Sequence, residues 1–426
     1  MKSADQRKKI EVWADWATLT QPMFMGFLYA MPIRGKEVFS FEYDTGWLKS
    51  PHAQIIDPAL GLYQGPQYAP EGHNNFGIFL DSSPDRWGRM LMDRREALIA
   101  RQEGRKPNTL YESDYLLGVH DKHRLGGLRF RLKPDGPFLA DHPTLASPPW
   151  TSLHELEDAS LQLEKDEIEK DVNYSKWLNM LIVPGSSLGG ARPKASVVDH
   201  QGQLWIAKFP SQNDKNDVGA WEDIVGKLAQ KAGLATAQGY SRKFGHRYHT
   251  FLTRRFDRDQ SCRRLHFASA MTLLKRTDGD HFSTGVSYLE LVQFILQNGS
   301  QPNQDLEQLW RRIVFFICIS NVDDHLRNHG FMLEPTGWRL SPAYDMNPVE
   351  TGNGLTLNIS ETDNAQDLDL AREVSKHFYL KLDHAEKIIQ EVVHAVKQWR
   401  QEAGAAKISL PEQDRMESAF RVADTY

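Results

Sequence analysis

The stretch Asn321-Val322-Asp323-Asp324-His325-Leu326-Arg327-Asn328 decides how the rest of the chain is interpreted. In it, Asp323 is followed five positions later by Asn328. A tight loop with this spacing can aim a carboxylate at an attacking hydroxyl oxygen and an amide oxygen at a metal ion beside it. Asp and Asn are common loop residues, so the spacing alone is a weak signal. The other parts of a phosphoryl-transfer site must be found elsewhere in the sequence.

The composition is that of an ordinary globular protein. The chain has 426 residues, with 51 Lys and Arg against 56 Asp and Glu, and a net charge of −5. This length is typical of roughly two or three domains. No global excess of positive charge favours nucleic acid, so such a contact needs a local patch. The two cysteines, Cys262 and Cys318, give no disulfide framework and favour a reducing cytoplasm.

No targeting or membrane segment is recognisable. The opening MKSADQRKKIEVWADW contains basic residues but lacks the apolar core of a signal peptide. The longest apolar run, residues 313–319, is too short to span a bilayer and predicts a buried helix, with Cys318 in the core.

Hydrophobic periodicity predicts a strand-bearing first part and a helical last part. We expect strands at 24–29, 37–43, 195–198, 204–208 and 247–256. We expect helices at 85–101, 153–170, 218–232, 288–297, 305–320 and 380–399, the first capped near Ser83. Proline-rich residues 135–150 predict a linker, and residues 331–340 a short hairpin. This is the outline of a bilobal α+β protein, as in protein kinases and in many other two-domain enzymes.

A glycine-rich loop, Gly185-Ser186-Ser187-Leu188-Gly189-Gly190, precedes two of the predicted strands. Glycines let backbone N–H groups approach a phosphate closely, because no Cβ holds it away. The loop is not a Walker A motif, because Ala191 stands where that motif needs Lys. The alternative is a hairpin loop without a ligand.

Lys208 ends the apolar strand Trp205-Ile206-Ala207-Lys208, which resembles the Val-Ala-Ile-Lys strand of protein kinases. A helix with Glu222 follows, and Glu222 could pair with Lys208 as the corresponding kinase glutamate does. The alternatives are an edge lysine that reaches to water and a solvated glutamate on a helix surface.

Asp345 follows Asn328 by 17 residues, a separation that a hairpin can fold back. One Asn and one Asp suit Mg²⁺, which prefers few, hard oxygen ligands and keeps water and phosphate for the rest. The alternative is that Asp345 caps a turn. For His325 we favour a role in orienting the loop over acid–base chemistry.

Three blocks together resemble the HipA family of bacterial toxin kinases. They are Ser186-Ser187-Leu188-Gly189-Gly190-Ala191-Arg192-Pro193-Lys194-Ala195, the Asn321–Asn328 stretch, and Ser341-Pro342-Ala343-Tyr344-Asp345. Arg255-Phe256-Asp257-Arg258 is similar to the motif that follows a strand in that family. Two further segments, Phe41-Glu42-Tyr43-Asp44 and Asp81-Ser82-Ser83-Pro84-Asp85-Arg86-Trp87-Gly88, extend the likeness to the first domain.

The resemblance implies an ATP- and Mg²⁺-dependent Ser/Thr protein kinase with a kinase-like, HipA-like fold. It implies a β-rich subdomain at 1–140, an ATP-binding part at 150–260, and a helical lobe with the catalytic and metal motifs at 261–426. By this resemblance Asp323 is the catalytic base, and Lys208 holds the phosphates. Asn328 and Asp345 are the magnesium ligands. The implied nucleotide-binding residues are Ser187, Gly189, Gly190, Lys208, Arg254, Phe256, His325 and Asn328.

The family also implies partners and self-modification. The expected partners are a HipB-like helix-turn-helix antitoxin, operator DNA through that complex or by direct local contacts, and a protein substrate such as an aminoacyl-tRNA synthetase or another translation factor. Ser187 is at the position of the family's autophosphorylated serine, with Ser186 as its rival. A phosphoserine there would repel nucleotide phosphates, so we expect it to expel the loop and to weaken ATP binding.

Several features depart from the family pattern, and rival functions remain open. Asp324 adds an acid where none is required, and Arg327 replaces the more usual Lys. Residues 265–270 resemble one branch of the family, which puts the target protein and the toxicity in doubt. The rivals are an antitoxin- and DNA-bridging corepressor with little kinase activity, a metal-dependent hydrolase using Asp323, Asp324, His325 and Asp345, and a small-molecule kinase.

Overall fold

The computed structural model describes residues 7–139, 148–165, 167–182, 190 and 192–426. The chain forms two compact units. The first unit contains residues 1–212 and 257–268, and the second contains residues 213–256 and 269–426. Each unit combines segments from more than one of the three parts expected from the sequence, and that three-part division stays a prediction.

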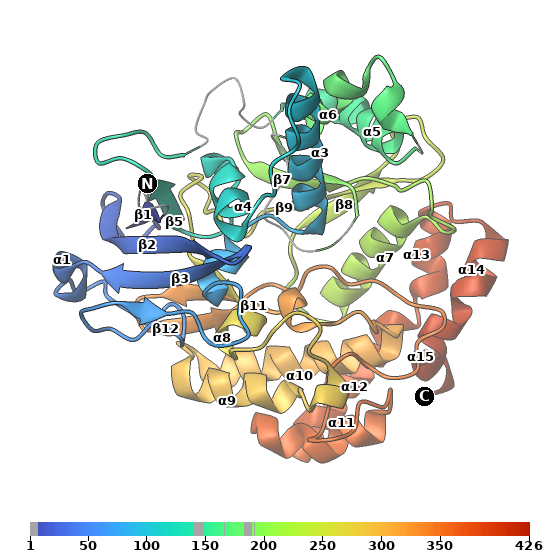
Figure 1. Cartoon of the computed structure of the whole chain (residues 1–426). Coiled ribbons are helices and arrows are strands. Elements are labelled where there is room, and N and C mark those ends of the chain that lie inside the picture. Colours follow the sequence, from blue (N-terminus) through green and yellow to red (C-terminus); the bar gives the residue numbers. More distant parts are fainter. Residues whose placement is uncertain (1–6, 140–147, 166, 183–189, 191) are drawn as a thin grey trace, which may run out of the picture. The chain divides into compact units, whose positions relative to one another are not determined.

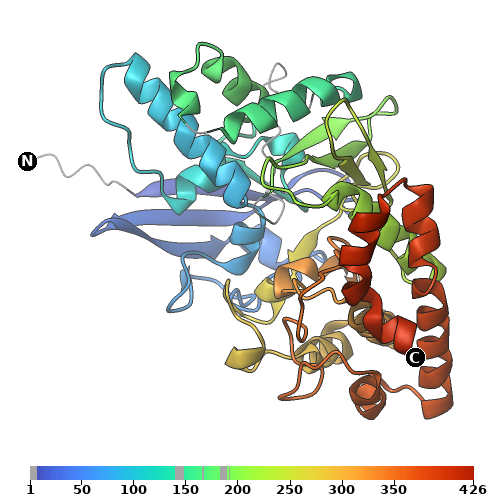
Figure 2. The same cartoon turned by 90° about the vertical axis from the view of Figure 1, so that its right-hand side faces the viewer.

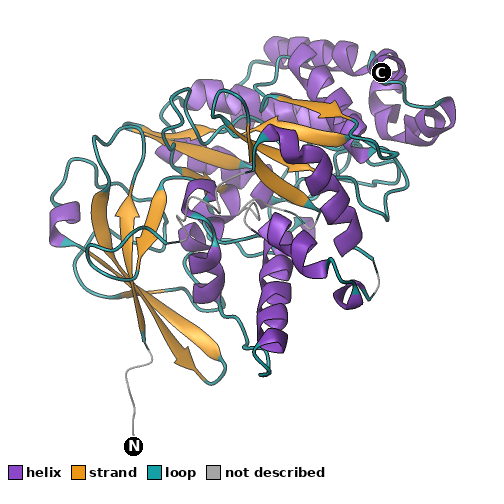
Figure 3. Ribbon diagram, turned by 90° about the horizontal axis from the view of Figure 1, so that it is seen from above, coloured by secondary structure: helices purple, strands orange, loops and turns teal. Residues whose placement is uncertain are grey.

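The first unit is built on an antiparallel sheet with the strand order β4-β3-β2-β1-β5. Figure 3 shows it from above as a separate group of orange strands. Both central residues of the β2–β3 turn, Arg34 and Gly35, have positive φ (49° and 80°), as tight two-residue hairpins require. The strands expected at 24–29 and 37–43 are confirmed. The bounds are β1 Lys8–Ala14, β2 Met23–Ile33, β3 Lys36–Tyr43, β4 Gln67–Tyr68 and β5 Leu128–Arg131.

Helices and a second hairpin complete the first unit. The α6 helix packs against α3 and α5, and the three lie side by side in Figure 1. The hairpin β6–β7 turns at residues 199–202, as expected. The bounds are α1 Thr45–Leu48, α2 Gly77–Asp81, α3 Arg86–Gln102, α4 Glu112–Gly118, α5 Leu153–Leu163, α6 Tyr174–Ile182, β6 Lys194–Val198 and β7 Leu204–Lys208.

Two sequence predictions in this unit were wrong in detail. The N-cap of α3 is Asp85, whose Oδ1 accepts from the backbone N of Gly88 at 2.8 Å. The hydroxyl of Ser83 instead donates to the carbonyl of Phe79 at 2.8 Å. The helix expected at 153–170 ends at Leu163 with Glu164 as its C-cap. A separate 3-10 turn, Ile168–Lys170, begins after Glu167, whose left-handed conformation (φ 56°) is incompatible with one continuous helix to Lys170.

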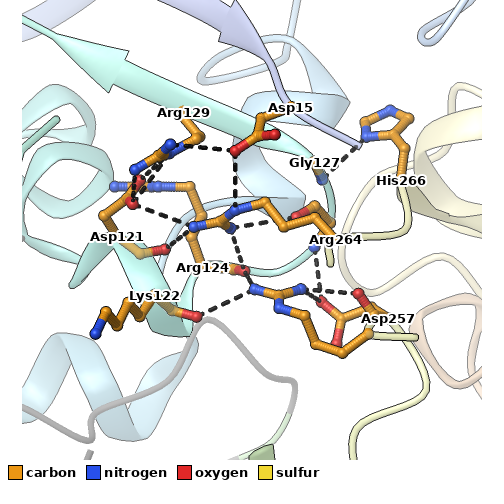
Figure 4. A network of polar contacts seen from close by, with 11 residues as sticks. Asp15, Asp121, Lys122, Arg124, Gly127, Arg129, Asp257, Arg264 and His266 are labelled. Atoms are coloured by element: carbon orange, nitrogen blue, oxygen red, sulfur yellow. Dashed lines mark hydrogen bonds and ion pairs between the residues drawn. The ribbon is translucent and has the colours of Figure 1, made fainter. Parts of the chain in front are cut away.

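A buried network of arginines and aspartates fastens segment 257–268 to the rest of the first unit (Figure 4). Asp121 accepts from Arg129 at 2.5 Å, and Arg264 donates to the Asp121 carbonyl at 2.6 Å and to its carboxylate at 3.2 Å. Asp257 accepts from Arg258 at 2.6 Å. Despite burial, the positive charges of Arg264 and Arg129 lower the pKa of Asp121. The network therefore needs Asp121 ionised.

We predict that Asp121→Asn destabilises the protein at pH 7 by about 3–5 kcal/mol, because it removes the buried carboxylate shared by Arg129 and Arg264 and leaves them only the more exposed Asp15. The folded-state pKa of Asp121 is depressed, so its contribution is present above the ordinary aspartate pKa and is lost as the pH falls through the folded-state value. Denaturant unfolding of both proteins at pH 7 and pH 3.5 checks this: the difference should shrink at the lower pH.

The control for this experiment is Glu167→Gln, which removes an exposed ion pair with Lys170. Its cost should stay below about 1 kcal/mol. A stability loss in Asp121→Asn no larger than in this control would contradict the role assigned to the network.

The second unit is mainly helical and contains two short hairpins, β8–β9 and β11–β12. The α10 helix packs against α12 and α15, and α7 packs against α12 and α13; Figure 2 shows the C-terminal helices in red beside the green α7. Its bounds are α7 Val218–Lys231, β8 Gly239–Arg242, β9 Thr250–Arg254, α8 Ala270–Leu273, α9 Tyr288–Asn298, α10 Pro302–Ile319, β11 Gly330–Glu334, β12 Gly337–Leu340, α11 Leu368–Val374, α12 Leu382–Val396, α13 Trp399–Ala405, α14 Leu410–Met416 and α15 Arg421–Thr425. A short strand, β10 Phe267–Ser269, lies where the two units join in sequence.

The expected core helix is confirmed: the side chains of residues 313–319 are at most 2% exposed, including Cys318. The expected strand at 247–256 is shorter, and the helix expected at 380–399 ends at Val396, with Trp399 starting α13. Within the described part of the chain, no helix is both long and apolar enough to cross a membrane.

Candidate active site

The Asp323 loop begins where α10 ends. Ser320 takes a left-handed conformation (φ 49°), and the backbone N of Asn321 donates back to the carbonyl of Phe316 at 3.0 Å. This closes the helix and turns the chain sharply. Beyond the turn, the side chain of Asp323 is exposed, whereas Asp324 is fully buried. The two adjacent carboxylates therefore have different environments and different roles.

Asn328 ends a short 3-10 turn, Leu326–Asn328, and is held against the start of the same loop. Its Nδ2 donates to the carbonyl oxygen of Asp323 at 2.9 Å. The amide oxygen is on the other side of the planar amide group and is the atom that a hard cation would bind. The five-residue spacing seen in the sequence is thus fixed by a hydrogen bond between its two ends.

Asp345 is brought back to this loop by the β11–β12 hairpin. After the hairpin, the backbone N of Ser341 donates to the carbonyl of Gly330 at 2.8 Å. Asp345 itself has φ 56°, a left-handed conformation that costs energy in a residue other than glycine. Such strain is concentrated at functional sites, where the surrounding structure holds the residue in place.

The electrostatics of Asp323 show which charges lie near it. Partial burial raises the pKa of its carboxyl, the positive charge of His325 lowers it, and the negative charges of Asp345 and Asp324 raise it again. Asn347 joins the two segments: its backbone N donates to Oδ1 of Asn321 at 3.2 Å, and its Nδ2 donates to Oδ1 of Asp345 at 3.5 Å. Asp345 therefore lies beside the start of the Asp323 loop, although 21 residues separate Asp323 and Asp345 in the chain. Mutual repulsion of this kind is relieved when a cation binds.

Asp324 points into the core of the second unit. Its Oδ2 accepts from the hydroxyl of Tyr288 and from Nε2 of His329, the latter at 2.8 Å. Burial and the charge of Asp324 raise the pKa of Tyr288 well above its usual value, so the phenol remains a hydrogen-bond donor. We expected Asp324 to add charge near the metal; its charge does act on Asp323, but its carboxylate is enclosed by this network.

Tyr344 connects the Asp345 segment to the Asp323 loop and to Phe256. Its hydroxyl donates to the carbonyl of Arg327 at 2.6 Å, and its ring lies 5.3 Å from the ring of Phe256. Phe256 follows β9, whose last residue is Arg254. The predicted adenine-binding segment and the predicted catalytic loop are therefore joined within one unit.

The remaining predicted site residues belong to the first unit. Lys208 ends β7 and pairs in register with Lys194 of β6. Lys194 is buried, and its ammonium group lies 3.0 Å from Asp85 and donates to the carbonyl of Gly190 at 3.2 Å. This ion pair anchors the end of the glycine-rich loop to the start of α3. Ser186, Ser187 and Gly189 lie outside the described residues.

The structure decides one of the alternatives for Glu222, whereas the role of the His325 side chain stays a prediction. The side chain of Glu222 is only 6% exposed, so it is not a solvated helix charge. Its pairing with Lys208 stays a prediction. His325 accepts from the backbone N of Asn328 through its own carbonyl at 2.8 Å. Its ring Nδ1 is buried and has no hydrogen-bond partner among the described residues.

Sequence reasoning missed several residues that hold the site together. They are Lys194, Tyr288, Arg312, His329 and Tyr344. Lys194 and Tyr344 lay inside quoted motifs and could have been identified from them. Tyr288 and Arg312 come from helices α9 and α10, and nothing in their local sequence distinguishes them from ordinary core residues.

The donor set fits a Mg²⁺–nucleotide complex. The oxygens of Asn328 and Asp345 are hard ligands, and a divalent cation would offset the negative charges of Asp323, Asp324 and Asp345. Among the described residues, no group of three or more His, Cys, Asp or Glu could hold a metal by itself.

The sequence and the fold match known proteins. Residues 186–400 match the family model described as "HipA-like C-terminal domain". In the solved Shewanella oneidensis MR-1 complex of the toxin–antitoxin proteins HipA and HipB with operator DNA, one chain superposes with a TM-score of 0.64 at 17% identity, covering 95% of both chains. This confirms the predicted α+β, kinase-like, HipA-like fold.

A relative in Haemophilus influenzae, named "Putative kinase", is 25% identical over 183 residues, which are 38% of this chain and 52% of that protein. The chain thus spans about half the length of that relative.

We predict that Tyr344→Phe increases hydrogen exchange of the amides in residues 326–330, because the Arg327 carbonyl loses its donor. The increase should be about two- to tenfold, corresponding to a net hydrogen-bond contribution of about 0.5–1.5 kcal/mol. Exchange followed by mass spectrometry measures it. Tyr379→Phe, at a tyrosine that is 71% exposed, serves as the control. Identical exchange of residues 326–330 in both variants would refute the anchoring role of Tyr344.

Proposed function

Because the chain belongs to the HipA family, we propose that it is an ATP- and Mg²⁺-dependent serine/threonine protein kinase that phosphorylates a protein serine and its own Ser187. One observation carries the proposal: Asp323, Asn328 and Asp345 belong to one unit, and hydrogen bonds of Asn328 and Asn347 hold their two segments together. These are the base, amide and carboxylate positions that phosphoryl transfer to a hydroxyl requires.

Each residue has a definite task in this proposal. Asp323 accepts the proton of the attacking serine hydroxyl, and its exposed side chain can be reached by a serine on a protein surface. The oxygens of Asn328 and Asp345 hold Mg²⁺, and Lys208 holds the inner phosphates. When bound, Mg²⁺ neutralises the charge that develops on the transferred phosphoryl group. The backbone near Arg254 and the ring of Phe256 receive the adenine, and His325 and Gly190 lie along the nucleotide.

The proposed partners are a HipB-like antitoxin and, through it, operator DNA. The Shewanella oneidensis complex, which contains HipA, HipB and operator DNA, supports this part of the proposal. It also supports the second candidate, a corepressor that bridges antitoxin and DNA with little kinase activity. The two candidates differ in one respect: only the kinase requires Asp323 for its effect on a partner protein.

The first test is transfer of labelled phosphate from ATP by the parent protein and by Asp323→Asn. We expect the substitution to lower the rate by about 10²–10⁴-fold, the usual contribution of a positioned general base. Asp383→Asn, on the exposed side of α12, is the matched control and should retain parental activity. If the parent labels neither itself nor any protein of a bacterial lysate, the kinase proposal is wrong.

The second test concerns self-inactivation. At ~5 Å and an effective dielectric near 20, each pair of unit charges on a phosphoserine and a nucleotide phosphate repels by roughly 3 kcal/mol. Ser187→Ala should therefore keep its ATP affinity during incubation with Mg²⁺–ATP, whereas the parent loses it. Ser186→Ala tests the rival serine: it should lose ATP affinity like the parent if Ser187 is the phosphorylated residue. Equal loss of ATP binding in the parent and both variants would exclude this mechanism.

A further inference from the structure

A buried polar network lies behind the proposed active site, and the proposed chemistry does not use it. It consists of Tyr288 of α9, Arg312 of α10, Asp324 and His329. None of these four side chains is more than 2% exposed. All belong to the second unit. Buried ionisable groups of this kind are costly, and therefore their arrangement calls for an explanation beyond stability.

The hydrogen bonds of the network have a defined direction. A guanidinium can only donate, so Nη1 of Arg312, 3.4 Å from Nδ1 of His329, makes that nitrogen an acceptor. The proton of the neutral imidazole is then on Nε2, which donates to Oδ2 of Asp324 at 2.8 Å. The Tyr288 hydroxyl donates to the same oxygen. Arg312 also connects the network to the segment that leads to Asp345, because its Nη2 donates to the carbonyl of Ser341 at 2.8 Å.

The network touches the backbone next to each proposed active-site residue. Asp324 directly follows Asp323, and His329 directly follows Asn328. Arg312 binds the carbonyl of Ser341, four residues before Asp345. One chain of hydrogen bonds therefore fixes the proposed base and both proposed metal ligands from behind.

The composition of the network argues against a role in stability alone. Oδ1 of Asp324 is buried and has no hydrogen-bond partner among the described residues. A buried carboxylate with one oxygen left unsatisfied stabilises a fold poorly compared with apolar side chains of similar volume. Proteins usually tolerate an unsatisfied buried polar group of this kind at functional sites, where side chains must be held in a fixed arrangement.

We propose that Asp324, held by Tyr288 and His329, is a positioning residue that sets the orientation of Asp323, and that Arg312 extends the same control to the Asp345 segment. This inference rests on the proposed kinase function and deepens it. The network touches no substrate. It fixes the positions of the reacting groups, and a displacement of such a group by about 1 Å can lower the rate about a hundredfold.

The test uses the full-length protein and the variants Tyr288→Phe, Asp324→Asn and their combination. Tyr288→Phe keeps the ring and removes one donor, so it is the variant that should fold. Ser375→Ala is the control, because it also removes a buried hydroxyl, which donates to the carbonyl of Arg372 at 2.7 Å, and lies in no part of the proposed site. Two quantities are measured: steady-state phosphate transfer, and hydrogen exchange of residues 321–330 and 341–345.

We expect both single variants to lower kcat by about tenfold or more, while KM for ATP changes by less than about threefold. The double variant should be no worse than the worse single variant, because both act on one network. Exchange should quicken in residues 321–330 and 341–345 in each network variant and stay at the parental rate there in Ser375→Ala. An unchanged kcat in both single variants, or a loss equal to that of Ser375→Ala, overturns the inference.

The two readouts separate this inference from the proposed function. If the parent transfers no phosphate, the kinase proposal fails, and hydrogen exchange alone decides whether the network anchors the two segments. Unchanged exchange in both segments of Tyr288→Phe and Asp324→Asn then refutes the anchoring, and faster exchange supports it.

Discussion

Repulsion between the carboxylates of Asp323 and Asp345 is the interaction on which the account of the site depends. Without a counter-ion, each negative charge opposes ionisation of the other. The pKa of Asp323 is raised chiefly by partial burial, and the charge of Asp345 raises it further against the lowering effect of His325. The chain nevertheless brings the two together, with Asp345 in a left-handed backbone conformation. A positive ligand bound between these carboxylates would offset their repulsion, and this is the role that the proposed function gives to Mg²⁺.

The backbone that maintains this arrangement is held from two sides. In front, Asn328 bonds to the carbonyl of Asp323, and Tyr344 bonds to the carbonyl of Arg327. Behind, Asp324 and His329 enter the core of the second unit. Exposed Asp323 is thus next to buried Asp324, whose contacts in the core hold the backbone that presents Asp323 to solvent.

Much of the fold could be predicted from local sequence patterns. Alternating apolar residues marked β2 and β3, and the apolar run of α10 was correctly assigned to the core. The errors arose where side chains compete for backbone groups. Ser83 looked like a helix cap, but its hydroxyl donates to a carbonyl and Asp85 takes the cap. The sequence predicted one helix as far as Lys170, but the left-handed conformation of Glu167 is incompatible with a continuous helix there.

The site was predictable only in part, for a physical reason. Asp323, Asn328 and Asp345 carry a spacing that a hairpin can close, and the sequence shows it. One partner of Asp324, His329, is only five residues away, but the other, Tyr288, comes from α9, 36 residues earlier, and no short sequence pattern connects it to the loop. Asp324 itself was expected to act near the metal, because two adjacent acids in a loop look alike in sequence. Asp323 is exposed and Asp324 is buried, and this difference arises only in the folded chain.

Binding of Mn²⁺, followed by electron paramagnetic resonance in the presence of a non-hydrolysable ATP analogue, tests the central claim most directly. If Asp323, Asn328 and Asp345 face one cation–nucleotide site, the parent protein binds Mn²⁺ together with the analogue. Asp345→Asn and Asn328→Ala should then each weaken that binding by about tenfold or more. Binding of equal strength in the parent and both variants would contradict the account.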